Sequence, residues 1–157
     1  MLYLGADHAG FKYKEKIKEF LTASDLKFED LGNLQLDPQD DFPIFAFRVA
    51  ERVAKDLAEG DQSARGILIC ANGLGMSIAA NKIKGIRAVL VTSKKVAQQS
   101  REHLDSNILC LGANTVSLSL AKKIIRIWLT TDFLPKERYV RRLKQITDKE
   151  NAVDPND

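Results

Sequence analysis

The chain of 157 residues is poor in cysteine, with only 2. Cys70 and Cys110 lie on different predicted strands and lack metal-site spacing, so neither a disulfide framework nor a metal site is expected. No apolar run approaches the roughly 20 residues that span a bilayer, so no membrane contact is predicted. A strand-like run at residues 2–4 leaves no room for a signal peptide. We therefore expect a cytoplasmic protein.

The chain also lacks a large excess of positive or negative charge. The net charge of +3 is too small to predict nucleic-acid binding by itself. The basic residues do gather near the C-terminus, at Lys136, Arg138, Arg141, Arg142 and Lys144. Tyr139 is the only aromatic residue among them, which disfavours a surface for stacked bases. Nucleic acid is thus not expected as a partner, and a solvated helix face is the plain alternative.

Strand-like and helix-like segments alternate along the chain. Short apolar runs predict five strands, at residues 2–4, 27–31, 67–69, 87–91 and 108–111. Apolar residues at helical spacing predict six helices, beginning near residues 11, 43, 76, 94, 117 and 136. Residues 34–41, which contain Pro38 and three aspartates, predict a loop. We expect one domain over residues 1–150 and a flexible polar tail over 151–157.

This alternation is typical of an α/β fold in which helices cover both faces of a parallel sheet. Five strands suit a three-layer, Rossmann-like arrangement, for which we predict the flavodoxin-like order 2-1-3-4-5. That order places the carboxyl ends of the first and third strands at one crevice. Asp7 and His8 follow the first strand and Cys70 follows the third, so the sequence predicts a ligand site at this crevice.

The stretch from residue 66 to 82 carries the densest chemical signal. Gly73 and Gly75 permit a tight turn between strand and helix, whose backbone N–H groups can cradle an anion. A cysteine precedes the turn, where the helix N-terminus favours a thiolate. The plain alternative is a buried cysteine that packs as a small hydrophobe. The predicted base and cradle are Cys70, Ala71, Asn72, Gly73, Leu74 and Gly75.

Four segments resemble the ribose-5-phosphate isomerase B and galactose-6-phosphate isomerase family, and ribose-5-phosphate isomerase B most of all. They are Gly5-Ala6-Asp7-His8-Ala9-Gly10, Asp41-Phe42-Pro43, residues 66–88 with Ser-Ile-Ala-Ala-Asn-Lys at 77–82, and Ser100-Arg101-Glu102-His103. The likeness runs from residue 1 to about residue 147. It implies interconversion of ribose 5-phosphate and ribulose 5-phosphate without metal or organic cofactor. Galactose 6-phosphate and allose 6-phosphate remain alternative substrates.

The resemblance also implies a role for each matching residue. Cys70 becomes the base that moves a proton between C1 and C2, and His103 the acid that opens the sugar ring. Met76 stands where one branch of the family has a glutamate base, which favours Cys70. The residues implied to contact sugar hydroxyls and phosphate are Asp7, His8, Arg138 and Arg142.

Several of these residues have plainer explanations. Asp7 could accept backbone N–H groups, His8 could cap the helix that follows it, and His103 could be a charge favoured at a helix C-terminus. The chain also departs from the family pattern, which leaves the preferred sugar open and keeps a non-catalytic sugar-phosphate binding module as an alternative. The departures are Phe42 for tyrosine, Ala71 for glycine, Asn72 for serine or threonine, Leu104 for asparagine and Asn114 for arginine.

The predicted topology separates His103 from Cys70. His103 ends the helix that precedes the fifth strand, at the opposite sheet edge from Cys70, and the two arginines lie in a later helix. If all of them serve one site, that site is shared between two subunits, and a two-fold homodimer is the simplest arrangement. The sequence does not decide between a dimer and a tetramer.

Overall fold

The computed structural model describes residues 1–152, and all five of its strands belong to one parallel sheet. The α/β, Rossmann-like fold is therefore confirmed. The predicted tail falls partly on residues 153–157, which lie outside the described residues. The strands are β1 (Leu2–Ala6), β2 (Phe28–Asp30), β3 (Arg65–Cys70), β4 (Ala88–Leu90) and β5 (Ile108–Gly112).

The strand order is β2-β1-β3-β5-β4, so the predicted order 2-1-3-4-5 is wrong for the last two strands. Burial accounts for the difference. All five residues of β5 are buried, as an inner strand of a doubly covered sheet requires, whereas two of the three residues of β4 are only half-buried. The pairing of β1 with β3, on which the predicted crevice depends, is present.

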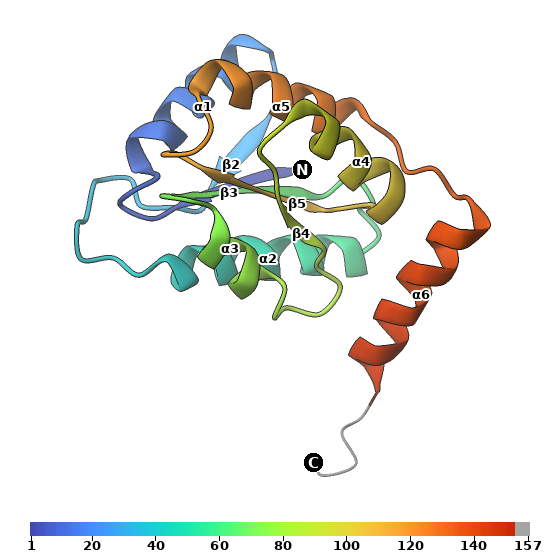
Figure 1. Ribbon diagram of the computed structural model, residues 1–157. Helices are drawn as coiled ribbons and strands as arrows, with labels where there is room; N and C mark the ends of the chain where they lie inside the picture. The colour runs from blue at the N-terminus through green and yellow to red at the C-terminus, as the bar shows by residue number, and fades with distance from the viewer. Residues whose placement is uncertain (153–157) are drawn as a thin grey trace.

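Helices cover both faces of the sheet. Figure 1 shows α1, α4 and α5 on one side of the strands and α2 and α3 on the other. The predicted six helices are all present, and the third begins two residues earlier than predicted, at Leu74. Their bounds are α1 (Phe11–Ala23), α2 (Phe42–Ala58), α3 (Leu74–Ala80), α4 (Lys94–Leu104), α5 (Leu118–Thr130) and α6 (Glu137–Asn151).

The sheet separates two apolar cores. On one face, Trp128 and Ile125 of α5 and Ile17 of α1 pack against alternate residues of the strands. On the other face, Val49 of α2 and Met76 of α3 pack against the remaining strand residues. Each of these five side chains is fully buried, so the strands, and with them the turns at their carboxyl ends, are held from both sides.

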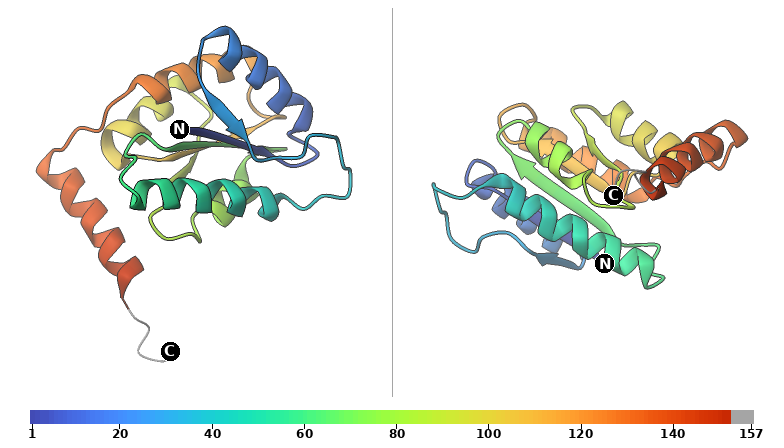
Figure 2. Two further views of the ribbon diagram at one scale, coloured as in Figure 1. Left: turned by 180° about the vertical axis from the view of Figure 1, so that it is seen from behind. Right: turned by 90° about the horizontal axis from the view of Figure 1, so that it is seen from below.

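The last helix differs from the others in its surroundings. Figures 1 and 2 show α6 beyond the edge of the sheet, joined to α5 by an extended connection. Its helix neighbour is α4, and Tyr139 is its buried residue. Most of α6, including Val140 and Ile146, is therefore exposed in a single chain.

Candidate active site

Cys70 ends β3, and the next residues form the glycine turn that starts α3. The backbone N–H of Gly73 donates a hydrogen bond to the Cys70 Sγ atom at 3.1 Å. Gly73 adopts a left-handed conformation with φ of 76°, which glycine tolerates best. The residue is 7% exposed, so the sulfur lies at the rim of the core beside a polar donor.

The turn after β1 lies against the end of β3, as predicted. The Asp7 N–H donates to the carbonyl of Ile69 at 3.4 Å. A Cβ atom at Gly10 would lie 2.5 Å from that same carbonyl oxygen, so only glycine allows the turn to approach so closely. Asp7 and Cys70 are thereby brought to one edge of the sheet.

Asp7 itself is buried and satisfied within its own turn. Its Oδ1 accepts the N–H of Gly10 at 2.9 Å, as in the plain explanation of this residue. Desolvation raises the pKa of the Asp7 carboxyl above its ordinary value. The geometry thus gives Asp7 a structural task in shaping the turn, whatever it also contacts in a substrate.

Two other segments close around the glycine turn. The ring of Phe42 covers Gly75, where a Cβ atom would meet its Cζ at 2.7 Å. The N–H of Asn114 donates to the carbonyl of Ala71 at 2.9 Å, which places this residue beside the turn. Asn72 and Leu74 are exposed, so the rim of the turn is open to solvent.

His8 is exposed, and its ring is held by Asp40, a residue that the sequence suggested only as a cap for the helix at Pro43. Asp40 Oδ1 lies 2.8 Å from the His8 Nδ1 and also accepts the His8 backbone N–H at 2.8 Å. The hydrogen bond to Asp40 raises the pKa of the His8 imidazole. The plain alternative that His8 caps α1 does not hold, because the N-cap of α1 is Gly10 and no side chain caps this helix. Asp40 was missed because it lies in a loop 32 residues away.

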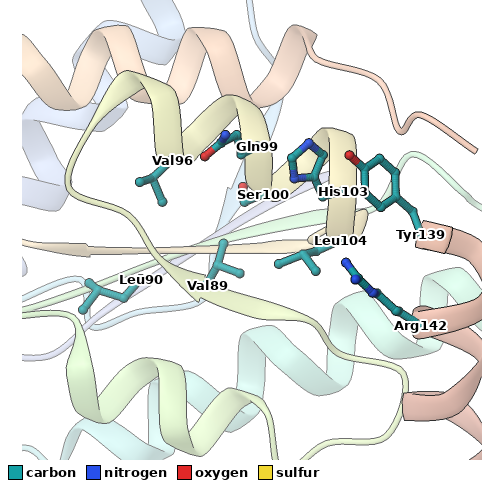
Figure 3. A pocket seen from close by; sticks show the side chains of 9 residues that line it. All are labelled: Val89, Leu90, Val96, Gln99, Ser100, His103, Leu104, Tyr139 and Arg142. Atoms are coloured by element: carbon teal, nitrogen blue, oxygen red, sulfur yellow. The ribbon is translucent and has the colours of Figure 1, made fainter. Parts of the chain in front are cut away.

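A second group of predicted site residues lies at the C-terminal end of α4. The His103 imidazole stacks on the Tyr139 ring, with 4.5 Å between ring centres. Arg142 faces the same cleft of about 460 Å³, as Figure 3 shows. Leu104, where the family pattern has a polar residue, also lines it. Arg138 Nη2 donates to the Tyr139 hydroxyl at 2.8 Å.

Within residues 1–152 these two groups stay separate. The residues that line the His103 cleft include neither Cys70 nor any member of the turn at 71–75. Leu90 lies between the groups, since it lines the cleft and its Cδ1 would be 2.5 Å from a Cβ atom at Gly73. A single chain thus places the thiol and anion cradle in one location and the imidazole and guanidinium in another.

No group of three or more His, Cys, Asp or Glu side chains within residues 1–152 is placed to hold a metal ion. None of the helices in this range combines the length and the apolar character that crossing a bilayer would require.

Comparison with known proteins identifies the family. A model of the ribose/galactose isomerase family matches residues 2–146. The chain belongs to this family. The solved structure of ribose-5-phosphate isomerase B from Mycoplasma genitalium with bound ribulose-5-phosphate is 38% identical, with a TM-score of 0.89 and 97% of both chains covered.

Two curated relatives in the ribose/galactose isomerase family carry different names. Ribose-5-phosphate isomerase B of Escherichia coli is 40% identical over 143 residues, which is 91% of each chain. D-erythrulose-4-phosphate isomerase 2 of Mycolicibacterium smegmatis is 37% identical over 153 residues, which is 96% of this chain and 97% of the relative. The resemblance found in the sequence is confirmed, and the chain is an enzyme of the sugar-phosphate isomerase class.

Proposed function

We propose that this enzyme interconverts ribose 5-phosphate and ribulose 5-phosphate through a cis-enediolate. His103 protonates the ring oxygen as the bond between that oxygen and C1 breaks, and the anomeric hydroxyl gives up its proton to solvent. The Cys70 thiolate then takes the proton from C2 of the aldose and returns it to C1, while the hydroxyl proton moves from O2 to O1. Proton transfer of this kind needs one positioned base and fixed donors for the oxygen on which charge develops.

The observation that carries the proposal is the contact between Cys70 Sγ and the N–H of Gly73. A backbone donor lies 3.1 Å from the sulfur proposed as the base, and the same turn offers further N–H groups to an enediolate oxygen. The neighbouring turn at Asp7 and His8 extends the site toward the rest of the sugar.

The arrangement of the two residue groups supports a site shared between two copies of the chain. His103 and Arg142 line a cleft that does not include Cys70. A second copy that brings its α4 and α6 to the glycine turn would complete the site and would cover exposed apolar residues of both parts. Leu74 and Ile78 of α3 are 59% and 66% exposed, and Val140 and Ile146 of α6 are 48% and 53% exposed. A two-fold homodimer satisfies both needs at once.

A different sugar phosphate is the second candidate. Leu104 offers no hydrogen bond in the cleft where the family pattern has an asparagine, and Asn114 beside Ala71 carries no charge where the pattern has an arginine. Specificity for a hydroxyl depends on such polar partners. The related enzyme named for erythrulose 4-phosphate indicates that sugars of other lengths belong in the assay.

Turnover of ribose 5-phosphate by the purified protein tests the reaction. We expect Cys70→Ser to lower kcat by about 10³-fold, within the range for loss of a general base, and His103→Ala to lower it by about 10²-fold. A panel with galactose 6-phosphate, allose 6-phosphate and erythrulose 4-phosphate separates the candidate substrates. Binding of these sugars with no turnover of any would favour the binding module instead.

Mixing the two inactive variants tests the shared site. A mixed dimer of Cys70→Ser and His103→Ala chains would contain one doubly altered site and one intact site. After joint refolding of equal amounts, activity should return to about a quarter of the unaltered level, because half of random dimers are mixed. Activity that stays at the level of the separate variants would place Cys70 and His103 of one chain in the same site.

A further inference from the structure

The loop that carries Asp40 is anchored to the rest of the fold by buried polar contacts. Lys14 of α1 is fully buried, and its Nζ donates to Asp30 Oδ2 at 2.6 Å and to the carbonyl of Asn33 at 2.8 Å. The Asn33 Nδ2 in turn donates to Asp40 Oδ2 at 3.2 Å. The Asp40 side chain is 5% exposed. A buried lysine and an amide thus fix a nearly buried carboxylate beside the exposed His8.

The other oxygen of the Asp40 carboxylate, Oδ1, contacts His8. Asp40 Oδ1 meets both the Nδ1 and the backbone N–H of His8 at 2.8 Å. Because a carboxylate accepts, the Nδ1 must carry the proton in this contact. Two contacts from one oxygen set the position of the residue and the plane of its ring. The His8 side chain remains 45% exposed, which leaves its Nε2 available to a ligand.

We propose that Asp40 is a positioning residue that fixes the His8 ring so that its Nε2–H is presented to the phosphate of the substrate. The inference rests on the proposed function, which extends the site to the turn at Asp7 and His8, and on the contact with the sugar phosphate that the family resemblance implies for His8. It assigns to Asp40, and through it to Asn33 and Lys14, a task in substrate binding that the sequence did not reveal.

Charge supports the same arrangement. The charged groups that face the His8 imidazole are Asp40 from the loop and Asp7 from its own turn, and both raise its pKa. An imidazolium donates from both nitrogens, so one N–H can bind Asp40 while the other binds phosphate. A hydrogen bond to a charged group is stronger than one between neutral groups. Asp40 therefore extends the pH range over which His8 binds an anion well.

The test uses NMR, because the chain has only two histidines, His8 and His103. The imidazole C–H signals of the full protein are followed against pH, and His8→Gln assigns them. Inorganic phosphate is then added as the probe. In the unaltered protein, phosphate should move the His8 signal. Asp40→Asn keeps the size and an accepting oxygen but loses the charge, so the His8 midpoint should fall to lower pH and phosphate should bind about tenfold more weakly near pH 7.

Two further variants separate this effect from loosening of the loop. Asp37→Asn removes an exposed charge from the same loop, and it should leave the His8 titration unchanged. Asn33→Ala removes the hydrogen bond to Asp40 Oδ2 but keeps the Asp40 carboxylate. The midpoint of the His8 titration should therefore stay near that of the unaltered protein. If Asp40→Asn weakens phosphate binding equally at all pH values and leaves the His8 midpoint in place, Asp40 only supports the loop and the inference is wrong.

Failure of the proposed function gives a different result. If the protein does not turn over ribose 5-phosphate, the assignment of that substrate is wrong. The inference about Asp40 would still be supported if the His8 signal responds to phosphate and to the Asp40→Asn change. Normal turnover in Asp40→Asn, with unchanged KM and an unchanged His8 midpoint, would overturn the inference and leave the isomerase intact.

Discussion

The imidazole of His103 stacks on the ring of Tyr139, with the two planes inclined by 27°. The contact joins α4 to α6, two helices that otherwise have few contacts, and it fixes the face that His103 turns to the cleft. The Tyr139 hydroxyl accepts a hydrogen bond from Arg138 at 2.8 Å. One aromatic ring thus connects the predicted acid to a predicted phosphate ligand.

Replacing this ring should affect catalysis more than replacing its hydroxyl. We expect Tyr139→Leu to lower kcat roughly tenfold, since stacking of this kind contributes about 1 kcal/mol and its loss frees the imidazole. Tyr139→Phe keeps the stack and loses only the Arg138 contact, so it should raise KM with little change in kcat. Steady-state kinetics separate the two outcomes, and an equal loss of kcat in both variants would contradict the role given to the stack.

The two cysteines should differ in reactivity toward an alkylating reagent. Complete burial raises the pKa of the Cys110 thiol, so this residue should stay unmodified in the folded protein. Cys70 has a backbone donor at its sulfur and lies at the rim of the core, so it should react. Mass spectrometry should find one modified thiol in the native protein, none in Cys70→Ser, and two in denaturant. Slower labelling in the presence of ribulose 5-phosphate would place the sugar at Cys70.

Two glycines in the same backbone conformation form a matched pair. Gly73 has φ of 76° and Gly85 has φ of 81°, but only the first is crowded. Gly85→Ala should cost about 1 kcal/mol of stability, the usual penalty of the left-handed region for a residue with a Cβ atom. Gly73→Ala adds a clash with Leu90 at 2.5 Å, so it should cost about 3 kcal/mol and abolish turnover. Denaturant unfolding measures both, and equal losses would show that the turn relaxes freely.

The buried pair of Lys14 and Asp30 should dominate the stability of the loop beside the site. Asp30→Asn leaves the fully buried ammonium without its main counter-charge, and we expect a loss of about 3 kcal/mol. Lys16→Gln breaks an ion pair between exposed side chains and should change stability very little, which makes it the control. A loss of similar size in both variants would argue against a special role for burial.

The pH dependence of this pair has a definite sign. Burial acts to raise the pKa of Asp30, but hydrogen bonds from Lys14 and Lys18 outweigh it and hold the pKa below its ordinary value. The stabilisation is therefore present above the unfolded pKa of about 3.9 and is lost as the pH falls through the folded value. Unfolding curves measured downward from pH 5 should show this loss, and Asp30→Asn should flatten it.

The sequence predicted the elements and the meeting of two turns because both depend on local patterns. Buried apolar runs define β1 and β3, and the small residues after them leave little choice of structure. It did not predict the positions of β4 and β5, since both run parallel and only their different burial distinguishes edge from interior. The sequence did not show this difference, because residues 88–91 and 108–111 are both unbroken apolar runs of four residues.

The side-chain contacts of the site could not be predicted from the sequence, for a different reason. Asp40 with His8, and Phe42 with Gly75, join residues about 30 positions apart through a loop whose path no periodicity describes. Such pairs depend on the closed geometry of the whole fold. The resemblance to a family supplied the roles of His103 and Arg142, and the structure places both residues at one cleft.

The order of the last two strands also bears on synthesis. In the described part of the chain, β4 pairs with β5 alone, although β4 is made first. A nascent chain that has emerged only as far as residue 104 lacks the strand that pairs with residues 88–90 and lacks α5, against which α4 packs. The part of the enzyme that carries His103 should therefore remain unanchored on the ribosome until β5 has followed it out.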